Sequence, residues 1–249
     1  MAMIRPDVML GRVELVDART IKAVNAYKGT EYAASATLFL EFSGSEAAVE
    51  SDVGVAREIS DSEGCEAFEF ESDEEGRERL WEARHEVALA IDELYGEERM
   101  VTTDVCVPIS DLPGALREAC KTIEFYDLNG AILSHVGDGI YHAVFPVDPN
   151  DESDLQVAEK VNAEIVDYAL ERGGTCTGEH GVGSGKTEHL EKEHGDSLPF
   201  MRKIKELADP NGILNPGKIF SGRSDRCPRM VDRGKTVGVE TRFGGQFCW

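Results

Sequence analysis

Two histidines flank a short glycine-rich turn in the segment Ser134-His135-Val-Gly-Asp-Gly-Ile-Tyr-His142. A seven-residue offset on one uninterrupted strand would place the two imidazoles on opposite faces of a sheet. The Gly137-Asp138-Gly139 turn breaks that alternation and predicts a hairpin, in which both rings converge on one point. Converging imidazoles suit a divalent transition metal; the alternative is two unrelated histidines beside a turn.

A second cluster, Gly173-Gly-Thr-Cys-Thr-Gly-Glu-His-Gly-Val-Gly-Ser-Gly-Lys186, follows a predicted helix. Its glycines let the backbone approach a ligand closely, and they surround the adjacent Glu179 and His180. Glu179 would complete a His–His–Glu metal site and His180 would act as a general base; the alternative is a flexible connection between helices. The Gly-Ser-Gly-Lys-Thr run resembles a phosphate-binding loop, but that motif needs a glycine where His180 stands and a strand before it. We therefore exclude a nucleoside triphosphatase.

One arginine lies on the apolar face of a predicted helix that is otherwise acidic. Arg84 shares the three-to-four spacing of Leu80, Val87 and Ile91. A buried guanidinium needs a partner, and the carboxylate of a substrate would serve through a bidentate pair. An internal ion pair with one of the many acidic side chains is the alternative.

The chain of 249 residues is strongly acidic, with 48 Asp and Glu against 26 Lys and Arg and a net charge of −22. This balance argues against nucleic acid or an anionic membrane as a partner. A folded protein with so acidic a surface fits a salt-rich cytoplasm, where self-repulsion is screened, and we interpret the chain as halophilic; an ordinary acidic protein is the alternative.

The composition also predicts the compartment. No apolar run approaches the ~20 residues that cross a bilayer, and the chain begins without the apolar core of a signal peptide. Six cysteines are widely spaced without a C-x-x-C pair, as expected for reduced thiols. We expect a cytoplasmic protein without an integral membrane segment, any contact with the inner face of the membrane being peripheral.

The elements that must position these residues alternate between strands and helices. Strands are predicted at 12–16, 36–42, 65–70, 100–108, 131–135 and 141–147, and helices at 18–27, 45–59, 73–94, 111–126, 155–172, 187–194 and 198–208. This order predicts an α+β fold with a mostly antiparallel sheet packed against helices. Residues 1–220 form the expected domain, and the glycine-rich, basic residues 221–249 are expected to be a poorly structured tail.

Five motifs occur together and in order. They are Leu80-Trp-Glu-Ala-Arg84, Thr103-Asp-Val-Cys-Val-Pro108, His135-Val-Gly-Asp-Gly-x-x-His142, Gly178-Glu-His-Gly-Val-Gly183 and Asn215-Pro-Gly-Lys218. The set resembles the C-terminal cap domain, ferredoxin-like in fold, of FAD-linked 2-hydroxyacid dehydrogenases, the group of cytochrome-type D-lactate dehydrogenase, the glycolate oxidase flavin subunit and D-2-hydroxyglutarate dehydrogenase. The resemblance covers roughly residues 12–220.

The resemblance implies a role for each motif. His135, His142 and Glu179 would bind a divalent, zinc-like ion. His180 would take the proton of the substrate hydroxyl, and Arg84 would bind the substrate carboxylate. Hydride would pass to FAD, to which this domain would contribute a few contacts from Asn215 and Lys218.

The sequence departs from the family pattern at two positions, and it lacks one domain of the family. Ile140 stands where the family usually has asparagine. Thr102 stands where the hydroxyglutarate enzymes use a lysine for a second carboxylate, which favours D-lactate or glycolate as the substrate. The N-terminal domain that holds most of the FAD in the family is missing from this sequence, which therefore predicts a separate FAD-binding subunit, a truncated gene or a decayed remnant.

Three functions remain open at this point. The leading one is the substrate- and metal-binding half of a flavin-dependent D-2-hydroxyacid dehydrogenase. The second is a non-catalytic assembly module for a separate FAD-binding chain. The third is a metal-dependent hydrolase built on the same two histidines and glutamate. The electron acceptor is not indicated by the sequence.

Overall fold

A computed structural model describes residues 8–95 and 99–220, so the tail predicted at 221–249 lies outside the described residues. The chain divides into two compact units, Met1–Glu179 and His180–Trp249. Among the described residues no helix is long and apolar enough to cross a membrane.

The first unit is built on an antiparallel sheet with the strand order β2-β1-β5-β6-β3, in which β4 also pairs with β6. Its strands are β1 (Leu10–Val16), β2 (Thr37–Phe42), β3 (Arg99–Thr102), β4 (Val105–Cys106), β5 (Ala131–His135) and β6 (Ile140–Val147). Its helices are α1 (Ala18–Lys28), α2 (Glu46–Ser62), α3 (Glu74–His85), α4 (Val87–Tyr95), α5 (Leu112–Phe125) and α6 (Glu152–Glu171). The antiparallel α+β fold expected from the sequence is confirmed.

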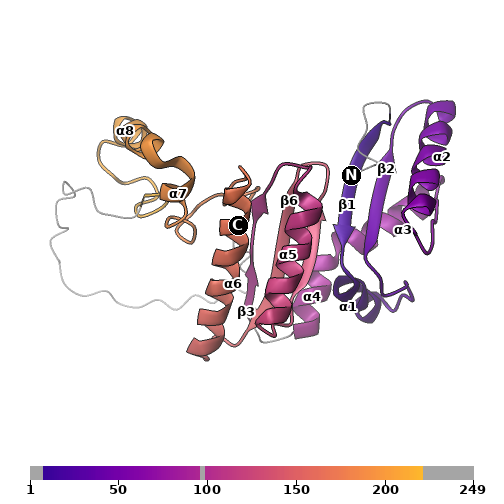
Figure 1. Ribbon diagram of the computed structural model, residues 1–249, viewed down its shortest axis with the longest axis horizontal. Helices are drawn as coiled ribbons and strands as arrows, with labels where there is room; N and C mark the ends of the chain where they lie inside the picture. The colour runs from indigo at the N-terminus through magenta and orange to yellow at the C-terminus, as the bar shows by residue number, and fades with distance from the viewer. Residues whose placement is uncertain (1–7, 96–98, 221–249) are drawn as a thin grey trace, which may run out of the picture. The chain divides into compact units, whose positions relative to one another are not determined.

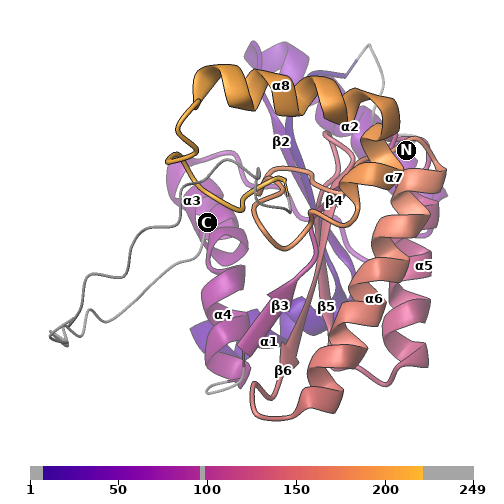
Figure 2. The ribbon, with the colours of Figure 1, turned by 90° about the vertical axis from the view of Figure 1, so that its left-hand side faces the viewer.

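Helices cover both faces of this sheet (Figures 1 and 2). On one face, α1 and α4 enclose an apolar cluster that contains Val16 of β1, Ala131 of β5 and Val144 of β6. On the other face, α5 and α6 pack against β6 and α6 also contacts β4. Since side chains alternate along a strand, β5 and β6 contribute to both cores, and only their ends near the β5–β6 turn can present polar groups.

Local sequence signals explain how several elements begin and end. The Asp17 side chain accepts a hydrogen bond from the backbone N–H of Thr20 and begins α1, and Gly29 ends that helix in the left-handed region. Ser45 caps α2 in the same way. These are the positions where a short polar side chain satisfies backbone groups that a helix end leaves without partners.

Three sequence predictions about this unit are wrong. The strand predicted at 100–108 is two short strands, β3 and β4. The strand predicted at 65–70 is not formed, because no strand pairs with it; the Phe68 ring instead lies under the Arg57 guanidinium of α2, 4.4 Å from ring centroid to Cζ. The helix predicted at 73–94 divides into α3 and α4 at Glu86. The division lets α3 pack against β2 while α4 packs against α1.

The second unit contains α7 (Leu190–His194), a short 3-10 helix η1 (Gly195–Ser197) and α8 (Leu198–Ala208), followed by a loop to Phe220. Asp209 organises the turn after α8. Its carboxylate accepts hydrogen bonds from the backbone N–H groups of Ile213 and Leu214, at 3.0 Å each, and from the Lys205 ammonium. The loop that begins at His180 and the segment that ends at Phe220 meet where the Ile219 N–H donates to the Gly183 carbonyl.

Candidate metal and substrate site

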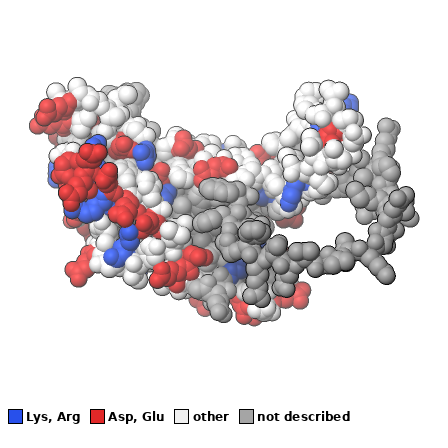
Figure 3. Space-filling view, turned by 180° about the vertical axis from the view of Figure 1, so that it is seen from behind, with Lys and Arg blue, Asp and Glu red and all other residues white. Residues whose placement is uncertain are grey.

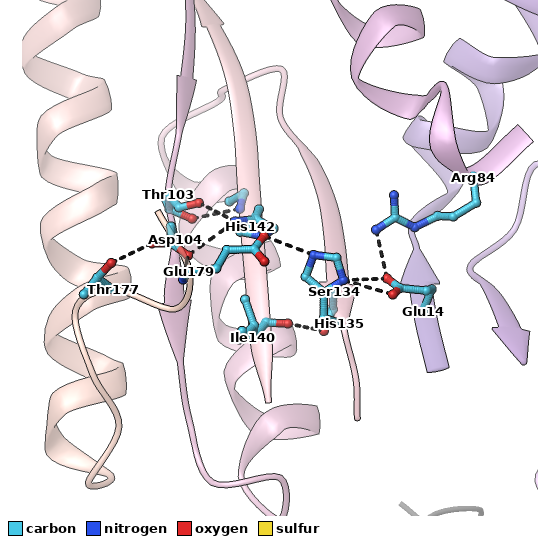
Figure 4. A network of polar contacts seen from close by, with 11 residues as sticks. Glu14, Arg84, Thr103, Asp104, Ser134, His135, Ile140, His142, Thr177 and Glu179 are labelled. Atoms are coloured by element: carbon cyan, nitrogen blue, oxygen red, sulfur yellow. Dashed lines mark hydrogen bonds and ion pairs between the residues drawn. The ribbon is translucent and has the colours of Figure 1, made fainter. Parts of the chain in front are cut away.

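The β5–β6 hairpin brings the two histidines to one face of the sheet (Figure 4). His135 pairs with Ile140 across the hairpin and His142 pairs with Leu133, so His135 and His142 are diagonal neighbours on the same face. Their ring centroids are 5.6 Å apart and the rings are nearly perpendicular. The hairpin expected from the Gly-Asp-Gly turn is formed, and the odd sequence offset no longer separates the two side chains.

Glu179 completes a three-residue group with the two histidines. Its Oε1 lies 3.2 Å from His135 Nε2 and 3.1 Å from His142 Nε2. Ligand atoms that share one Zn²⁺ at about 2.0–2.1 Å lie about 3.3 Å from one another, so each imidazole nitrogen has with Glu179 Oε1 the spacing of two ligands of one ion. Together the three side chains form a group that could hold a metal ion.

Glu179 is placed by a buried aspartate on the link between β3 and β4. Asp104 is 1% exposed; its Oδ1 accepts the Glu179 backbone N–H at 2.9 Å and its Oδ2 accepts the Thr177 hydroxyl at 2.9 Å. Between these two contacts, Gly178 lies so close to the sheet that a Cβ there would come within 2.7 Å of Asp104 Oδ1 and 2.8 Å of Ile140 Cγ2. The glycine in this motif is therefore required for the close approach of the loop.

Each histidine uses its second ring nitrogen for an acceptor. His142 Nδ1 lies 3.0 Å from the Thr103 carbonyl oxygen, and His135 Nδ1 lies 3.0 and 2.9 Å from the two carboxylate oxygens of Glu14. A carbonyl and a carboxylate only accept, so both rings carry a proton on Nδ1. Metal-binding histidines have this arrangement, in which the outer partner fixes the tautomer and leaves the Nε2 lone pair for the metal.

The Thr103 carbonyl is available to His142 because of an unusual hydrogen bond between neighbouring strands. β3 and β4 pair with β6 in the same register, Thr102 with Val144 and Val105 with Tyr141, but the ladder is interrupted between them. There the Ala143 N–H donates to the Thr103 side-chain hydroxyl at 2.8 Å. The hydroxyl takes the place of a backbone acceptor in the ladder and leaves the carbonyl free for the imidazole.

The contacts of Glu14 with His135 and Arg84 also shift the pKa values of Glu14 and His135. Burial would raise the pKa of Glu14, but the hydrogen bond with His135 and the charge of Arg84 outweigh it and lower that pKa. The hydrogen bond with Glu14 raises the pKa of His135, against the effect of burial. Without a cation between them, two neutral Nε2 lone pairs would face the Glu179 carboxylate, so the arrangement calls for either protons or a metal ion.

Arg84 reaches the same network from α3. Its Nη2 lies 2.8 Å from Glu14 Oε2, and the two side chains are 11% and 14% exposed. The internal ion pair weighed in the sequence analysis is therefore formed, with Glu14 as the partner. The Arg84 Nε is buried and has no hydrogen-bond partner among the described residues, so the guanidinium retains a donor for a further acceptor.

The remaining candidates lie in the second unit. His180 is its first residue and directly follows Glu179 in the chain. Lys218 is brought to the glycine-rich loop, where its Nζ donates to the Ser184 hydroxyl at 3.2 Å, and Asn215 adopts the left-handed backbone region that asparagine tolerates. The roles expected for His180, Asn215 and Lys218 stay predictions.

Sequence reasoning missed Glu14, and it quoted Thr103 and Asp104 only within a motif. Glu14 alternates with Val13 and Leu15 as a solvent-facing residue of a half-buried strand would, and nothing local distinguishes it. For the other two residues, adjacent polar side chains inside a predicted strand were an available signal. Polar groups in a strand core must have partners, and both are buried here.

The fold and the site define an α+β domain whose central hairpin and following loop present two histidines and a glutamate to one point. The chain belongs to the family "FAD linked oxidases, C-terminal domain", whose model matches residues 2–219.

Curated relatives agree with the family. The chain is 38% identical over 218 residues to "Probable D-lactate dehydrogenase, mitochondrial" of Danio rerio, covering 87% of this chain and 44% of that protein. It is 36% identical over 214 residues to a mitochondrial D-lactate dehydrogenase (cytochrome) of Arabidopsis thaliana, covering 86% and 38%. It is 29% identical over 211 residues to glycolate oxidase subunit GlcD of Escherichia coli strain K12, covering 84% and 42%. The chain thus spans about two fifths of the length of these relatives.

Among solved structures, the chain is similar to a 4-ethylphenol oxidase from Gulosibacter chungangensis, with a TM-score of 0.57 and 13% identity, covering 84% of this chain and 47% of that one. At this identity the likeness concerns the fold alone. It agrees with the antiparallel α+β architecture.

Proposed function

We propose that the chain is the substrate- and metal-binding half of a flavin-dependent D-2-hydroxyacid dehydrogenase that oxidises D-lactate or glycolate to the 2-oxo acid. The observation that carries the proposal is the convergence of His135, His142 and Glu179, with both Nδ1 atoms already engaged by outer partners. The family supports FAD chemistry, and relatives named D-lactate dehydrogenase and glycolate oxidase support a hydroxy acid as the substrate class.

In this proposal, His135, His142 and Glu179 hold a divalent, zinc-like ion. Two imidazoles and one carboxylate are a donor set typical of catalytic zinc, which leaves positions open for a substrate. When bound there, such an ion supplies Lewis acidity that lowers the pKa of an α-hydroxyl.

The other residues bind and orient the substrate and move its proton. Arg84 binds the substrate carboxylate, using donors that the Glu14 ion pair leaves available and fixing the orientation of the α-carbon. His180 accepts the hydroxyl proton on an imidazole nitrogen. Asn215 and Lys218 would contribute contacts to FAD, which when bound would supply the hydride acceptor for the α-carbon.

In this proposal, FAD binding needs a further portion of protein, because the relatives are more than twice as long as the stretch they share with this chain. We propose an FAD-binding portion that works with this domain, on the same polypeptide or on a separate subunit. A non-catalytic assembly module for such a subunit is the alternative function, and the flavin experiment below separates the two.

The first test is metal binding by the purified chain, measured by Zn²⁺ titration and by metal content after dialysis. We expect one Zn²⁺ per chain, and we expect His142→Ala to lose it because His142 is 3% exposed and contributes one of three ligands. His85→Ala is the matched control, since His85 is exposed on α3 and stacks on Trp81. Equal zinc content in all three proteins would reject the site.

The second test is a visible absorption spectrum of the chain folded in concentrated KCl with FAD and then freed of unbound cofactor. Retained flavin absorbance that bleaches on addition of D-lactate or glycolate would support catalysis by this chain. A colourless protein that binds zinc would place the flavin chemistry on another portion. Reconstitution with that portion, followed by no turnover of either acid, would favour the assembly module.

A further inference from the structure

The carboxylate of Glu14, which is not one of the three candidate metal ligands, contacts both the candidate ligand His135 and the candidate substrate-binding Arg84. Glu14 stands directly opposite His135 in the pairing of β1 with β5. Its oxygens lie 3.0 and 2.9 Å from His135 Nδ1, and one of them lies 2.8 Å from Arg84 Nη2 (Figure 4). The Glu14 side chain is only 14% exposed, so solvent screens these interactions weakly.

The contact with His135 has a chemical consequence at the other end of the ring. A carboxylate that accepts the Nδ1 proton fixes the tautomer, turns the ring and makes Nε2 a better donor to a metal ion. That Nε2 is the atom that lies 3.2 Å from Glu179 Oε1. For His142 the same task falls to the Thr103 backbone carbonyl, whereas His135 has the Glu14 side chain as its partner.

We propose that Glu14 is a positioning residue that aligns His135 for metal binding and holds the Arg84 guanidinium beside the same site. The inference rests on the proposed metal site and adds a residue to it. Through one carboxylate, β1 links the ligand on β5 to the arginine on α3.

The competing explanation is a purely structural ion pair that fastens α3 to the sheet. A structural role would make Glu14 important for stability through Arg84 and leave the metal affinity alone. The positioning role makes the His135 contact decisive, so removal of Glu14 must weaken metal binding more than removal of Arg84.

The chain offers a matched control two strands from His135. Glu41 on β2 makes an ion pair with Arg12 at 2.7 Å, and no contact joins it to either histidine among the described residues. Glu41→Gln therefore removes the same charge from the same sheet and an ion pair with the same kind of partner. Any loss shared by the variants of Glu14 and Glu41 comes from charge or sheet stability.

The experiment measures Zn²⁺ affinity of the full chain by competition with a chromogenic chelator, for wild type, Glu14→Ala, Glu14→Gln, Arg84→Gln and Glu41→Gln. We expect Glu14→Ala to weaken binding about 10- to 100-fold, the usual effect of losing an outer partner of a metal-binding histidine. Glu14→Gln keeps an acceptor and should lose less, while Arg84→Gln and Glu41→Gln should stay near wild type. Wild-type zinc affinity in both Glu14 variants would overturn the positioning role of Glu14 and leave the proposed metal site standing. Failure of the wild-type chain to bind zinc would overturn the proposed metal site itself.

A second readout needs no metal and detects positioning directly. Long-range ¹H–¹⁵N spectra of the imidazoles report which ring nitrogen carries the proton. In the metal-free chain at a pH where His135 is neutral, we expect the Nδ1–H tautomer in wild type and Glu41→Gln, and a mixture of tautomers in Glu14→Ala. An unchanged tautomer in Glu14→Ala would contradict the positioning role even if that variant were less stable.

Discussion

The two compact units differ sharply in charge and in burial. Residues 1–179 contain 39 acidic and 14 basic residues, a balance of −25, whereas residues 180–220 contain six of each. Figure 3 shows acidic side chains gathered at the end of the first unit that carries α2 and α3. The first unit compensates for this self-repulsion with apolar cores on both faces of its sheet.

The described residues of the second unit, 180–220, form little apolar core. Of its described residues, Leu190 is the hydrophobic side chain that is buried, while apolar side chains of α8 and the following loop are exposed: Phe200, Ile204, Leu207, Ile213, Leu214 and Ile219. Backbone and carboxylate hydrogen bonds around Asp209 organise it instead. The candidate metal ligands therefore lie in the first unit, where packing and strand register fix their positions. The candidate flavin contacts lie in the second unit, where hydrogen-bonded turns fix the backbone.

The largest expected effect comes from the core of the first unit. Phe145 on β6 is 0% exposed and Phe200 on α8 is 67% exposed. Phe145→Ala should lower the free energy of unfolding by about 3–5 kcal/mol, and Phe200→Ala should change it by less than about 0.5 kcal/mol. Urea unfolding followed by circular dichroism measures both, and similar losses would show that the second unit buries its aromatic side chain as the first does.

The next effect concerns the interrupted ladder at Thr103. Thr103→Val keeps the shape but leaves the buried Ala143 N–H without its acceptor, so stability should fall by about 1–3 kcal/mol. Zinc affinity should also fall, because the Ala143 N–H then competes with the His142 imidazole for the Thr103 carbonyl. Thr103→Ser retains the hydroxyl and should keep most of both properties; a Ser variant that loses as much as the Val variant would contradict the role given to the hydroxyl.

A smaller effect is expected from salt, and it should distinguish the units. KCl screens the repulsion among the acidic residues of the first unit, so the Tm of that unit should rise between low and molar salt. Residues 180–220, whose charges balance, are the internal control, and their amide hydrogen exchange should depend less on salt. A Tm that is flat in KCl would contradict the halophilic interpretation.

The smallest effect is a pH dependence confined to the second unit. The Lys205 ammonium and the N–H groups of Leu214 and Ile213 lower the pKa of Asp209 below its ordinary value of 3.8. A lowered carboxyl pKa stabilises the fold above the unfolded pKa, and this contribution is lost as the pH falls through the folded pKa. The protection of the Ile213 and Leu214 amides against hydrogen exchange, relative to their intrinsic exchange rates, should therefore fall as the pH drops below 3.8, and Asp209→Asn should show the lower protection at every pH; unchanged protection in that variant would contradict the role of the carboxylate.

Much of the fold followed from local signals. The Gly-Asp-Gly turn gave a hairpin, and Asp17 and Ser45 began helices, because each depends on residues a few positions away. The errors arose where contacts with distant parts of the chain determine the secondary structure. The alternating residues 65–70 have no neighbouring strand to pair with. The predicted helix 73–94 is divided at Glu86, because its two parts pack on different elements.

The same distinction divides the candidate site. The sequence by itself indicated His135, His142 and Glu179 as candidate ligands, because a glycine-containing turn and a glycine-rich loop mark them, but a contact of Asp104 with the Glu179 N–H positions the glutamate. The tertiary structure alone decided that Glu14 meets His135 across 121 residues and Arg84 across 70. Strand register sets those contacts, and register depends on how whole faces of the sheet are buried, which no local spacing specifies.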